Sequence, residues 1–267
     1  MCRLLGYLGP PIQLARLLEQ PEHSLIIQSY QPREMTSGLL NADGFGVGWY
    51  HALHDCEPFT YRNTQPIWSD TNLAELSRYI ESGCILASVR SATPGQAVQI
   101  SNCQPFRHGS ILATHNGYIE NFRQTLYRTV RDTLDDAYYR IIDGTTDSEH
   151  IFALLLQYLD YSTTAGDAEA LQAALHATVS ILSKWAAVDA LRVGLNLIVS
   201  DGKQLVASRY ASTSPAPTLY WLRDDPRFPE AVLVASEPLF ASDGWTSCPE
   251  NSFLSIGANL DVQTGRL

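Results

Sequence analysis

Short apolar runs separated by turn-forming residues make up most of the hydrophobic pattern of this chain. Residues 2–9 form such a run and predict a strand that ends at Pro10 and Pro11, because proline lacks the N–H that a sheet requires. Residues 12–20 place three leucines on one helical face and predict a short helix. Further runs of strand length predict strands at residues 45–50, 57–62, 84–91, 110–115, 193–200, 203–210, 218–223, 231–236 and 253–257.

Helical spacing of apolar residues recurs at three later places in the chain. Residues 72–82 alternate with a helical period. Residues 146–149 read Thr-Asp-Ser-Glu, a capping box that precedes the apolar run 151–159 and places Asp147 in the first turn of a helix. Residues 171–185 carry an apolar stripe and predict a second long helix.

The order of these elements indicates the fold class. Strands come first, two long helices follow, and strands return, which differs from the regular strand–helix alternation of a doubly wound parallel sheet. The pattern therefore predicts an α+β protein whose sheets are covered by helices. Neither an internal repeat nor a linker interrupts the chain, so we expect a single domain over residues 1–267.

Composition places the chain among globular proteins. Apolar residues make up 45% and charged residues 17% of its 267 residues, which argues against disorder. No apolar run reaches the roughly 18 residues of a membrane span, and the N-terminus lacks the apolar core of a secretory signal, so we expect a cytoplasmic protein without membrane contact. The formal charge of −10 and the absence of a basic cluster argue against a nucleic-acid partner.

Two motifs that suggest a cofactor are weak. Residues 43–48 read Asp-Gly-Phe-Gly-Val-Gly, but this glycine spacing is not followed by a helix, as a nucleotide-binding loop would be. Residues 51–56 contain two histidines, an aspartate and a cysteine, without a second ligand pair at the spacing of a zinc site. We therefore expect neither a metal nor a cofactor.

Cys2 differs from the other cysteines because it directly follows the initiator Met. The five cysteines are odd in number and widely spaced, which indicates reduced thiols rather than a disulfide framework. The initiator Met is normally removed when a small residue follows, and Cys2 would then carry both a thiol and a free α-amine. Because the amine titrates near about 7.8 and the thiol near about 8.5, the amine can accept the thiol proton. A small buried strand residue is the alternative interpretation, and the two stand about equal.

Three further segments supply groups that suit acyl transfer on an amino acid substrate. Arg90 ends a predicted strand, and its planar fork suits a carboxylate, with a surface ion pair as the alternative. Asn116 and Gly117 end another predicted strand and offer two donors for an oxyanion, with an ordinary Asn-Gly turn as the alternative. Asp147 lies at a helix start, where contact with the helix dipole is the ordinary role.

Together these segments carry a resemblance to a known family. The sequence resembles the glutaminase domains of class II glutamine amidotransferases, which are N-terminal-nucleophile hydrolases, and the resemblance runs across nearly the whole chain. The fold that it implies is a four-layer αββα sandwich of two mostly antiparallel sheets, in the α+β class. The segments that carry the resemblance are residues 1–3, 41–48, 90–93, 102–106, 115–117 and 146–149.

The resemblance implies a role for each candidate site residue. Cys2 would be the nucleophile after removal of Met1, and Asn116 with Gly117 would form the oxyanion hole. A retained Met1 would block the α-amine and leave the protein inactive. No metal or cofactor takes part in this chemistry.

On the substrate side, the resemblance implies a charge clamp for an amino acid. Arg90 would bind the α-carboxylate and Asp147 the α-ammonium, with Thr93 nearby. Ser91 stands where the family commonly has tryptophan, which would open the pocket beyond the γ-glutamyl group.

Four segments narrow the resemblance to the stand-alone γ-glutamyl hydrolases of ergothioneine biosynthesis. The implied reaction is cleavage of γ-glutamyl-hercynylcysteine sulfoxide, a small-molecule substrate, through a Cys2 thioester. Alternatives are a glutaminase subunit that supplies ammonia to a partner synthase, a glutathione-type γ-glutamyl peptidase, or a partner-binding module without activity. A homo-oligomer is left open. The four segments are residues 28–33, 65–70, 235–238 and 243–245.

A trimethylammonium group on the leaving side of the substrate would require aromatic faces and acidic groups around the outer pocket. We expect most of the candidate rings to be core residues and one or two to face the site. The candidates are Phe45, Trp49, Trp68 and Trp245.

Overall fold

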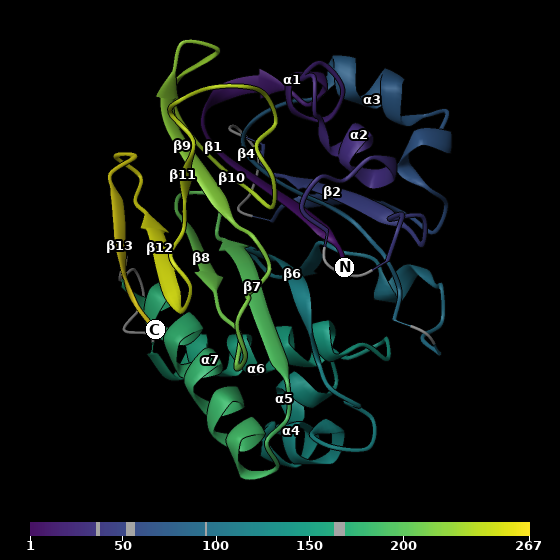
Figure 1. The fold of residues 1–267 in the computed structure, drawn as a ribbon, viewed down its shortest axis with the longest axis vertical. Helices are drawn as coiled ribbons and strands as arrows, with labels where there is room; N and C mark the ends of the chain where they lie inside the picture. The colour runs from purple at the N-terminus through teal and green to yellow at the C-terminus, as the bar shows by residue number, and fades with distance from the viewer. Residues whose placement is uncertain (36–37, 52–56, 94, 163–168) are drawn as a thin grey trace.

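The computed structural model of the chain describes residues 1–35, 38–51, 57–93, 95–162 and 169–267. Within these residues, the strands form two antiparallel sheets, and helices lie on the outer side of each (Figure 1). The predicted α+β, αββα sandwich is confirmed by this arrangement. None of the helices in the described ranges is long and apolar enough to cross a membrane.

The first sheet has the N-terminal strand near its middle. In the described part of the chain its strand order is β11-β9-β10-β1-β4-β2-β3, and every neighbouring pair is antiparallel. These strands are β1 (Arg3–Gln13), β2 (Phe45–Trp49), β3 (Phe59–Asn63), β4 (Glu81–Val89), β9 (Tyr220–Asp225), β10 (Phe228–Ala235) and β11 (Thr246–Ser247).

The second sheet packs against the first. Over the described residues its order is β13-β12-β8-β7-β6-β5, again antiparallel throughout. These strands are β5 (Phe106–His108), β6 (Ile111–Ile119), β7 (Val193–Ser200), β8 (Leu205–Arg209), β12 (Ser252–Ile256) and β13 (Val262–Arg266). The β7–β8 pair is the hairpin that the sequence predicts.

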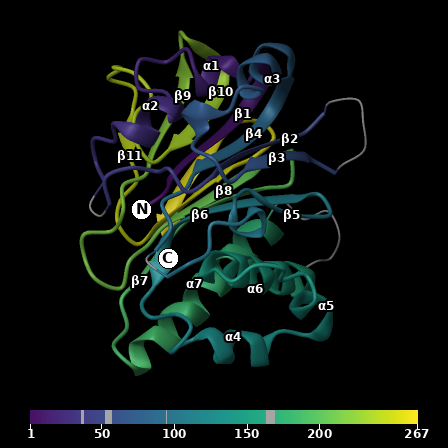
Figure 2. The ribbon, with the colours of Figure 1, turned by 90° about the vertical axis from the view of Figure 1, so that its right-hand side faces the viewer.

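Helices form the two outer layers. The first sheet is covered by α1 (Ala15–Leu18), α2 (Leu25–Tyr30) and α3 (Leu73–Tyr79), and the second by α4 (Tyr127–Thr133), α5 (Asp136–Tyr139), α6 (Asp147–Ser162) and α7 (Ala170–Val188). Figure 2 shows these layers on opposite sides of the sheets. Two short 3₁₀ helices, η1 (Ile67–Ser69) and η2 (Ile100–Asn102), lie in connections.

Apolar side chains fill three spaces between these layers. Leu17 and Phe45 belong to the layer between α1–α3 and the first sheet. Leu4 and Ile198 belong to the layer between the two sheets, and Leu175 to the layer under α6 and α7. Each of these side chains is fully buried, and burial of one such side chain contributes roughly 1.5–3 kcal/mol.

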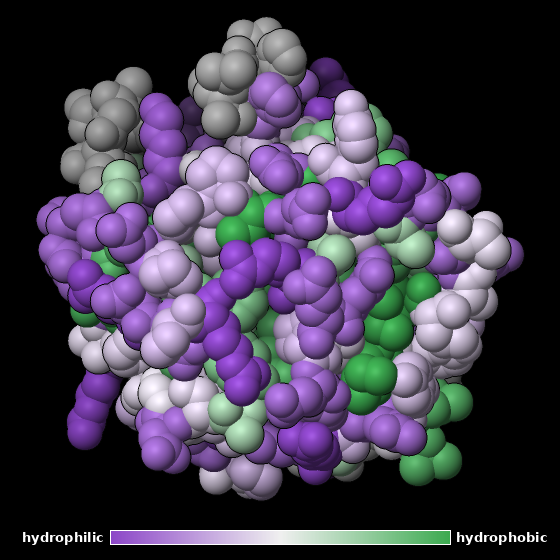
Figure 3. All heavy atoms as spheres, turned by 90° about the horizontal axis from the view of Figure 1, so that it is seen from above, coloured by the Kyte–Doolittle hydropathy of each residue, from purple (hydrophilic) through white to green (hydrophobic). Residues whose placement is uncertain are grey.

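The outer surface over the first sheet is largely polar. Figure 3 shows hydrophilic residues over most of this face, with smaller hydrophobic areas among them. Helix α1 accordingly buries Ala15, Leu17 and Leu18 against the sheet and leaves Arg16 outside. Helix α1 therefore follows the amphipathic pattern expected of a helix in a covering layer.

The prediction for the end of the first strand was wrong. Strand β1 continues through Pro10 and Pro11 to Gln13, which reduces the helix expected over residues 12–20 to α1. The β1–β4 register shifts between Leu8 and Ile12. This bulge removes the prolines from the hydrogen-bonded ladder, so their missing N–H groups do not end the strand.

The strand expected over residues 110–115 is also longer than predicted. Strand β6 continues to Ile119, and Asn116 and Gly117 pair with Asn196 and Leu195 of β7. The Asn-Gly pair is therefore not a turn, because pairing with a distant strand outweighs the local turn preference.

The predicted capping box at the start of α6 is half formed. The hydroxyl of Thr146 accepts a hydrogen bond from the N–H of Glu149 at 3.2 Å. The Glu149 carboxylate accepts from the N–H groups of Asp143 at 3.0 Å and Gly144 at 2.6 Å instead of turning back to Thr146. Asp147 lies in the first turn of α6, as predicted.

Candidate active site

Cys2 lies immediately before β1, at the edge where β4 ends. The antiparallel register pairs Arg3 with Val89 as the last pair at this end of the β1–β4 ladder. Cys2, which precedes Arg3, and Arg90, which follows Val89, therefore lie side by side just beyond the sheet. Figure 1 marks the N-terminus at this position. The predicted nucleophile and the predicted carboxylate-binding residue are thus brought together by the β1–β4 ladder.

The alternation of side chains along β6 places Asn116, the oxyanion candidate, on the face that is directed toward Cys2 and the first sheet. Leu4 and Leu8 of β1 belong to the core between the sheets, and Cys2 continues this spacing of two. Leu112 of β6 also belongs to that core, so Asn116, four residues later, lies on the same face of β6. Cys2 and Asn116 therefore belong to facing sides of the two sheets.

Gln104 joins the two sheets beside these residues. Its side-chain nitrogen donates to the His115 carbonyl at 3.1 Å, and its side-chain oxygen accepts from the His115 N–H at 2.5 Å. Its own carbonyl accepts from the Ser88 hydroxyl at 3.1 Å, and Ser88 pairs with Leu4. Sequence reasoning missed this bridge, although Gln104 lies in the segment 102–106 that carries the resemblance.

The Asn116 side chain is buried without a hydrogen-bond partner. It is 0% exposed, and among the described residues neither its Nδ2 nor its Oδ1 atom is paired. An unsatisfied buried polar group costs about 1–3 kcal/mol. Such a group calls for an explanation, and a ligand that supplies the missing partner is one.

Gly117 is required by the close approach of β7. A Cβ atom at Gly117 would lie 1.9 Å from the Gly194 oxygen. His115 Nε2 lies 3.0 Å from the same oxygen, which can only accept, so Nε2 carries the proton and Nδ1 accepts from Ser148 Oγ at 2.9 Å. Burial lowers the pKa of His115, which keeps this tautomer neutral. His115 thereby ties the predicted oxyanion segment to β7 and to α6.

Arg90 is a buried cation held by neutral oxygens. Its side chain is 5% exposed and donates to the Asp43 carbonyl at 3.2 Å, and to Gln96 Oε1 and the Ala97 carbonyl at 3.3 Å each. None of the ion pairs formed by the described residues includes Arg90. The alternative of a surface ion pair is therefore wrong, and the guanidinium has the charge to bind a carboxylate.

Asp147 is buried at the start of α6 and connects it to β6. Its Oδ2 accepts from the Ile119 N–H at 2.8 Å, and its Oδ1 accepts from the Ser148 N–H at 2.8 Å. A carboxylate has about four lone-pair sites, so it retains the capacity to accept from an ammonium group. Thr93 is exposed and lies in the loop that contains Gln96, whose N–H donates to the Thr93 carbonyl at 3.0 Å.

Met1 precedes Cys2 in the structure. A Cβ atom at Gly38 would lie 3.7 Å from the α-nitrogen of Met1 and 3.3 Å from the Ser91 hydroxyl. Burial lowers the pKa of this α-amine. Removal of Met1 would make Cys2 the N-terminal residue with a free α-amine, which is the arrangement expected from the sequence.

The other described thiols are poor nucleophile candidates. Cys2, Cys84, Cys103 and Cys248 are free, and Cys2 is the partly exposed one among these four. Burial raises the pKa of Cys84 and of Cys248 to about 12, and it raises the pKa of Cys103. Cys56 lies outside the described residues.

The glycine motif serves sheet packing. Gly46 and Gly48 lie in β2, where a Cβ atom would approach the Gln104 oxygen to 2.2 Å and the Leu112 side chain to 2.7 Å, respectively. Glycine therefore lets the two sheets come close, and the next element that the described residues form after β2 is the strand β3, not the helix that a phosphate-binding loop would require.

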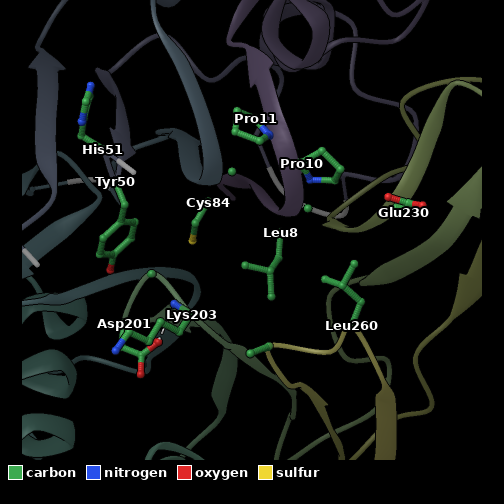
Figure 4. A pocket seen from close by; sticks show the side chains of 14 residues that line it. Leu8, Pro10, Pro11, Tyr50, His51, Cys84, Asp201, Lys203, Glu230 and Leu260 are labelled. Carbon is green, nitrogen blue, oxygen red and sulfur yellow. Dashed lines mark hydrogen bonds between the residues drawn. The ribbon is translucent and has the colours of Figure 1, made fainter. Parts of the chain in front are cut away.

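No cluster that could hold a metal is found among the described residues. His54, Asp55 and Cys56 of the weak metal motif lie outside them. A pocket of about 640 Å³, shown in Figure 4, lies where Leu8 pairs with Cys84, at the other end of the β1–β4 ladder from Cys2. Its lining includes Leu8, Tyr50, Cys84, Lys203 and Leu260, and none of the predicted site residues.

The four candidate aromatic residues have different surroundings. Phe45 is fully buried under the α1–α3 layer, and Trp245 packs on Phe240 of the same core. Trp68 meets Tyr30 edge-on, with ring centroids 5.7 Å apart. Trp49 lines a groove of about 570 Å³ with Phe59, Tyr61 and residues of α3. Phe45 is therefore a core residue, as expected for most of the four.

Comparison with protein families matches residues 14–237 to the class II glutamine amidotransferases. Over 96% of its length the chain is 34% identical to the "Probable glutamine amidotransferase DUG3" of Saccharomyces cerevisiae, of which it covers 82%. Over 96% of its length it is 32% identical to the "Gamma-glutamyl-hercynylcysteine sulfoxide hydrolase" of Mycobacterium tuberculosis, of which it covers 93%.

A solved structure supports the same relationship. A "glutamine aminotransferase class-II domain protein" from Silicibacter pomeroyi superposes with a TM-score of 0.70 at 26% identity. The match covers 100% of this chain and 99% of that chain. The likeness therefore extends through both sheets and both helical layers.

Proposed function

The chain belongs to the class II glutamine amidotransferases, and from this premise we propose that it hydrolyses γ-glutamyl amide bonds with Cys2 as the nucleophile. After removal of Met1, the α-amine of Cys2 takes the thiol proton and the sulfur attacks the γ-carbonyl carbon. The carbonyl oxygen becomes an oxyanion that accepts from the Asn116 side chain and the Gly117 N–H.

The two products, the amine and glutamate, are released in the two steps that follow. The tetrahedral intermediate expels the amine, which takes the proton from the α-ammonium, and a γ-glutamyl thioester remains on Cys2. Water then adds to the thioester carbon while the α-amine accepts a proton from it. The carbon–sulfur bond breaks, glutamate leaves, and the Cys2 sulfur takes the proton back from the α-ammonium, which restores the free thiol and the free α-amine.

The observation that carries this proposal is the buried, unpartnered Asn116 carboxamide on the face of β6 that is directed toward β1. An oxyanion would supply the acceptor that its Nδ2 lacks among the described residues. A group preorganised in this way requires no rearrangement when charge develops, which is the basis of oxyanion stabilisation.

Substrate recognition is proposed to rest on three residues. The buried Arg90 guanidinium would bind the α-carboxylate through its planar fork. Asp147 would accept from the α-ammonium with its remaining lone pairs, and Thr93 would lie at the edge of this clamp. The two charges complement an amino acid zwitterion.

Covalent labelling tests the nucleophile. The γ-glutamyl electrophile 6-diazo-5-oxo-norleucine should form one adduct on a Met1-free Cys2, detected by intact mass and peptide mapping. Cys2→Ala should abolish the adduct and the release of glutamate, whereas Cys248→Ala, the matched control, should retain both. Steady hydrolysis by pure Cys2→Ala protein would refute the assignment.

We propose that the substrate is γ-glutamyl-hercynylcysteine sulfoxide, which the Mycobacterium tuberculosis relative is named for, and that the leaving group is hercynylcysteine sulfoxide. The small Ser91 side chain leaves room for such a group beyond the γ-glutamyl moiety. A second candidate is a glutaminase that acts with a partner. The 34% identity to the yeast relative, which is named a probable glutamine amidotransferase, is similar to the 32% identity to the hydrolase. Comparison of kcat/KM for glutamine, glutathione and the hercynyl conjugate separates these candidates, and a preference for glutamine would favour the second.

A further inference from the structure

Glu237 is a buried carboxylate on which three distant segments converge. It is 1% exposed, and its Oε1 atom accepts from Arg3 Nη1 at 2.8 Å. Its Oε2 atom accepts from His23 Nε2 at 2.7 Å. The N–H groups of Arg33 and Glu34 donate to it at 2.8 Å and 3.1 Å. The start of β1, the residue before the Ser24 cap of α2 and the chain beyond α2 thus share one anion.

The first of these segments contains the proposed nucleophile. Arg3 Nε donates to the carbonyl oxygen of Cys2 at 2.7 Å, while Nη1 of the same guanidinium binds Glu237. The Arg3 side chain is fully buried. A rigid planar fork that contacts both groups limits the positions of the Cys2 main chain.

The chain beyond α2 approaches the N-terminus. Glu34 is held a second time by the Tyr220 hydroxyl, which lies 2.9–3.0 Å from its two carboxylate oxygens. Four residues later, Gly38 is the position where a Cβ atom would lie 3.7 Å from the Met1 nitrogen. Glu237 therefore holds both Arg3, the residue after Cys2, and the main chain at residues 33 and 34. The latter segment leads to Gly38, which lies close to the N-terminus.

The charge state of Glu237 suits this role. Burial alone would raise the pKa of this carboxyl, but the hydrogen bonds from His23 and from the N–H groups of Arg33 and Glu34, with the charge of Arg3, lower its pKa to about 2. Glu237 is therefore an anion throughout the range in which a thiol nucleophile functions.

Stability alone is a weak reason for this arrangement. A buried ion pair is often no more stabilising than apolar residues of similar volume. In addition, the Nη2 atom of Arg3 is buried and has no partner among the described residues, which is unfavourable.

We propose that Glu237, acting through Arg3, is a positioning residue for the Cys2 nucleophile. This inference rests on the proposed function. The Glu237 carboxylate holds Arg3 so that its Nε fixes the Cys2 carbonyl, and the same carboxylate fixes the main chain at residues 33 and 34. Glu237 itself contacts neither substrate nor the reacting atoms.

The test compares Glu237→Gln with the unmodified protein. An amide has the shape of the carboxylate but lacks its charge and one acceptor, so the Arg3 fork loses its fixed partner. We expect the maximal rate of Cys2 labelling by 6-diazo-5-oxo-norleucine, and kcat for glutamate release from glutamine, to fall about 10- to 100-fold through misplacement of the nucleophile. The half-saturating concentrations should change by less than about threefold, because the Arg90 and Asp147 clamp is intact.

Asp201→Asn is the matched control. Asp201 also accepts backbone N–H bonds, from Lys203 and Gln204, but it lines the pocket remote from Cys2. This variant should label at the unmodified rate. Equal rate losses in both variants would attribute the effect to general loosening and overturn the proposal.

Arg3→Lys supplies a second variant in case Glu237→Gln does not fold. An ammonium group can pair with Glu237 but lacks the fork that reaches the Cys2 carbonyl at the same time. It should also lose rate with little change in half-saturation, and an unmodified rate in folded Arg3→Lys would overturn the positioning role. Absence of Cys2 labelling in the unmodified protein would instead refute the proposed function, so the two failures are distinguishable.

Discussion

The Asn116 carboxamide leads to a prediction that separates activity from stability. Asn116→Ala should lower kcat by about 10²- to 10³-fold with little change in KM, as expected for loss of one oxyanion donor. The free energy of unfolding should not fall, because the side chain makes no hydrogen bond within the described residues and its removal relieves the cost of an unsatisfied buried group. Steady-state kinetics and urea unfolding check the two halves, and a change mainly in KM would place Asn116 in ground-state binding.

The planar guanidinium of Arg90 can be tested by a substitution that keeps its positive charge. Arg90→Lys should lower kcat/KM for a γ-glutamyl substrate by roughly 10- to 100-fold, because an ammonium cannot reproduce the charge-assisted fork to a carboxylate. Arg16→Lys, which changes an arginine on α1 that donates to the Arg227 carbonyl, is the control and should be unaffected. Efficient cleavage of an α-amidated substrate by the unmodified protein would show that Arg90 does not bind the α-carboxylate.

The contact between strand β2 and the second sheet can be tested by adding single methyl groups. Gly46→Ala should lower the free energy of unfolding by about 1–3 kcal/mol, because its Cβ atom would meet the Gln104 backbone oxygen, which is held in the bridge between the sheets. Gly48→Ala on the same face meets the flexible Leu112 side chain and should be less harmful. Urea unfolding of both variants checks the order, and equal losses would contradict the rigid role of Gln104.

Elements with strong local signals were predictable from the sequence. The periodic stripe of α7, the capping residue of α6 and the β7–β8 hairpin all follow from their own residues. Strands β5, β11 and β13 were missed because they are short or lie at a sheet edge. The end of β6 was misjudged because its pairing with β7 joins residues about 80 positions apart, which no local pattern reports.

The candidate site was predictable to the extent that chemistry marks single residues. Cys2, Arg90 and Asn116 were identified from residue type, position and resemblance. The residues that hold them were not, because the contacts of Gln104 with Ser88 and His115, and of Glu237 with Arg3, form only when separate strands pack together. Resemblance pointed to their segments without stating what their side chains contact.

The acid stability of the whole molecule provides a final prediction. His150 is fully buried between two fixed partners: its Nδ1 lies 2.7 Å from the Thr146 carbonyl, and its Nε2 accepts from Arg131 Nε at 3.1 Å. Burial lowers the pKa of His150 to about 4, and the charge of Arg131 acts in the same direction. The folded protein thus keeps this ring neutral at a pH at which the unfolded chain protonates it.

The unfolded state therefore binds more protons than the folded state between about pH 6.5 and pH 4, and stability falls as the pH falls through this window. The loss due to His150 should reach about 3 kcal/mol by pH 4 and grow only slightly below it. Urea unfolding of His150→Gln should accordingly show a smaller difference between pH 7 and pH 4 than the unmodified protein. His108→Gln, at an exposed position on β5, is the control and should retain the full difference. An unchanged pH dependence in His150→Gln would mean that other buried groups, not this ring, set the acid limit of the fold.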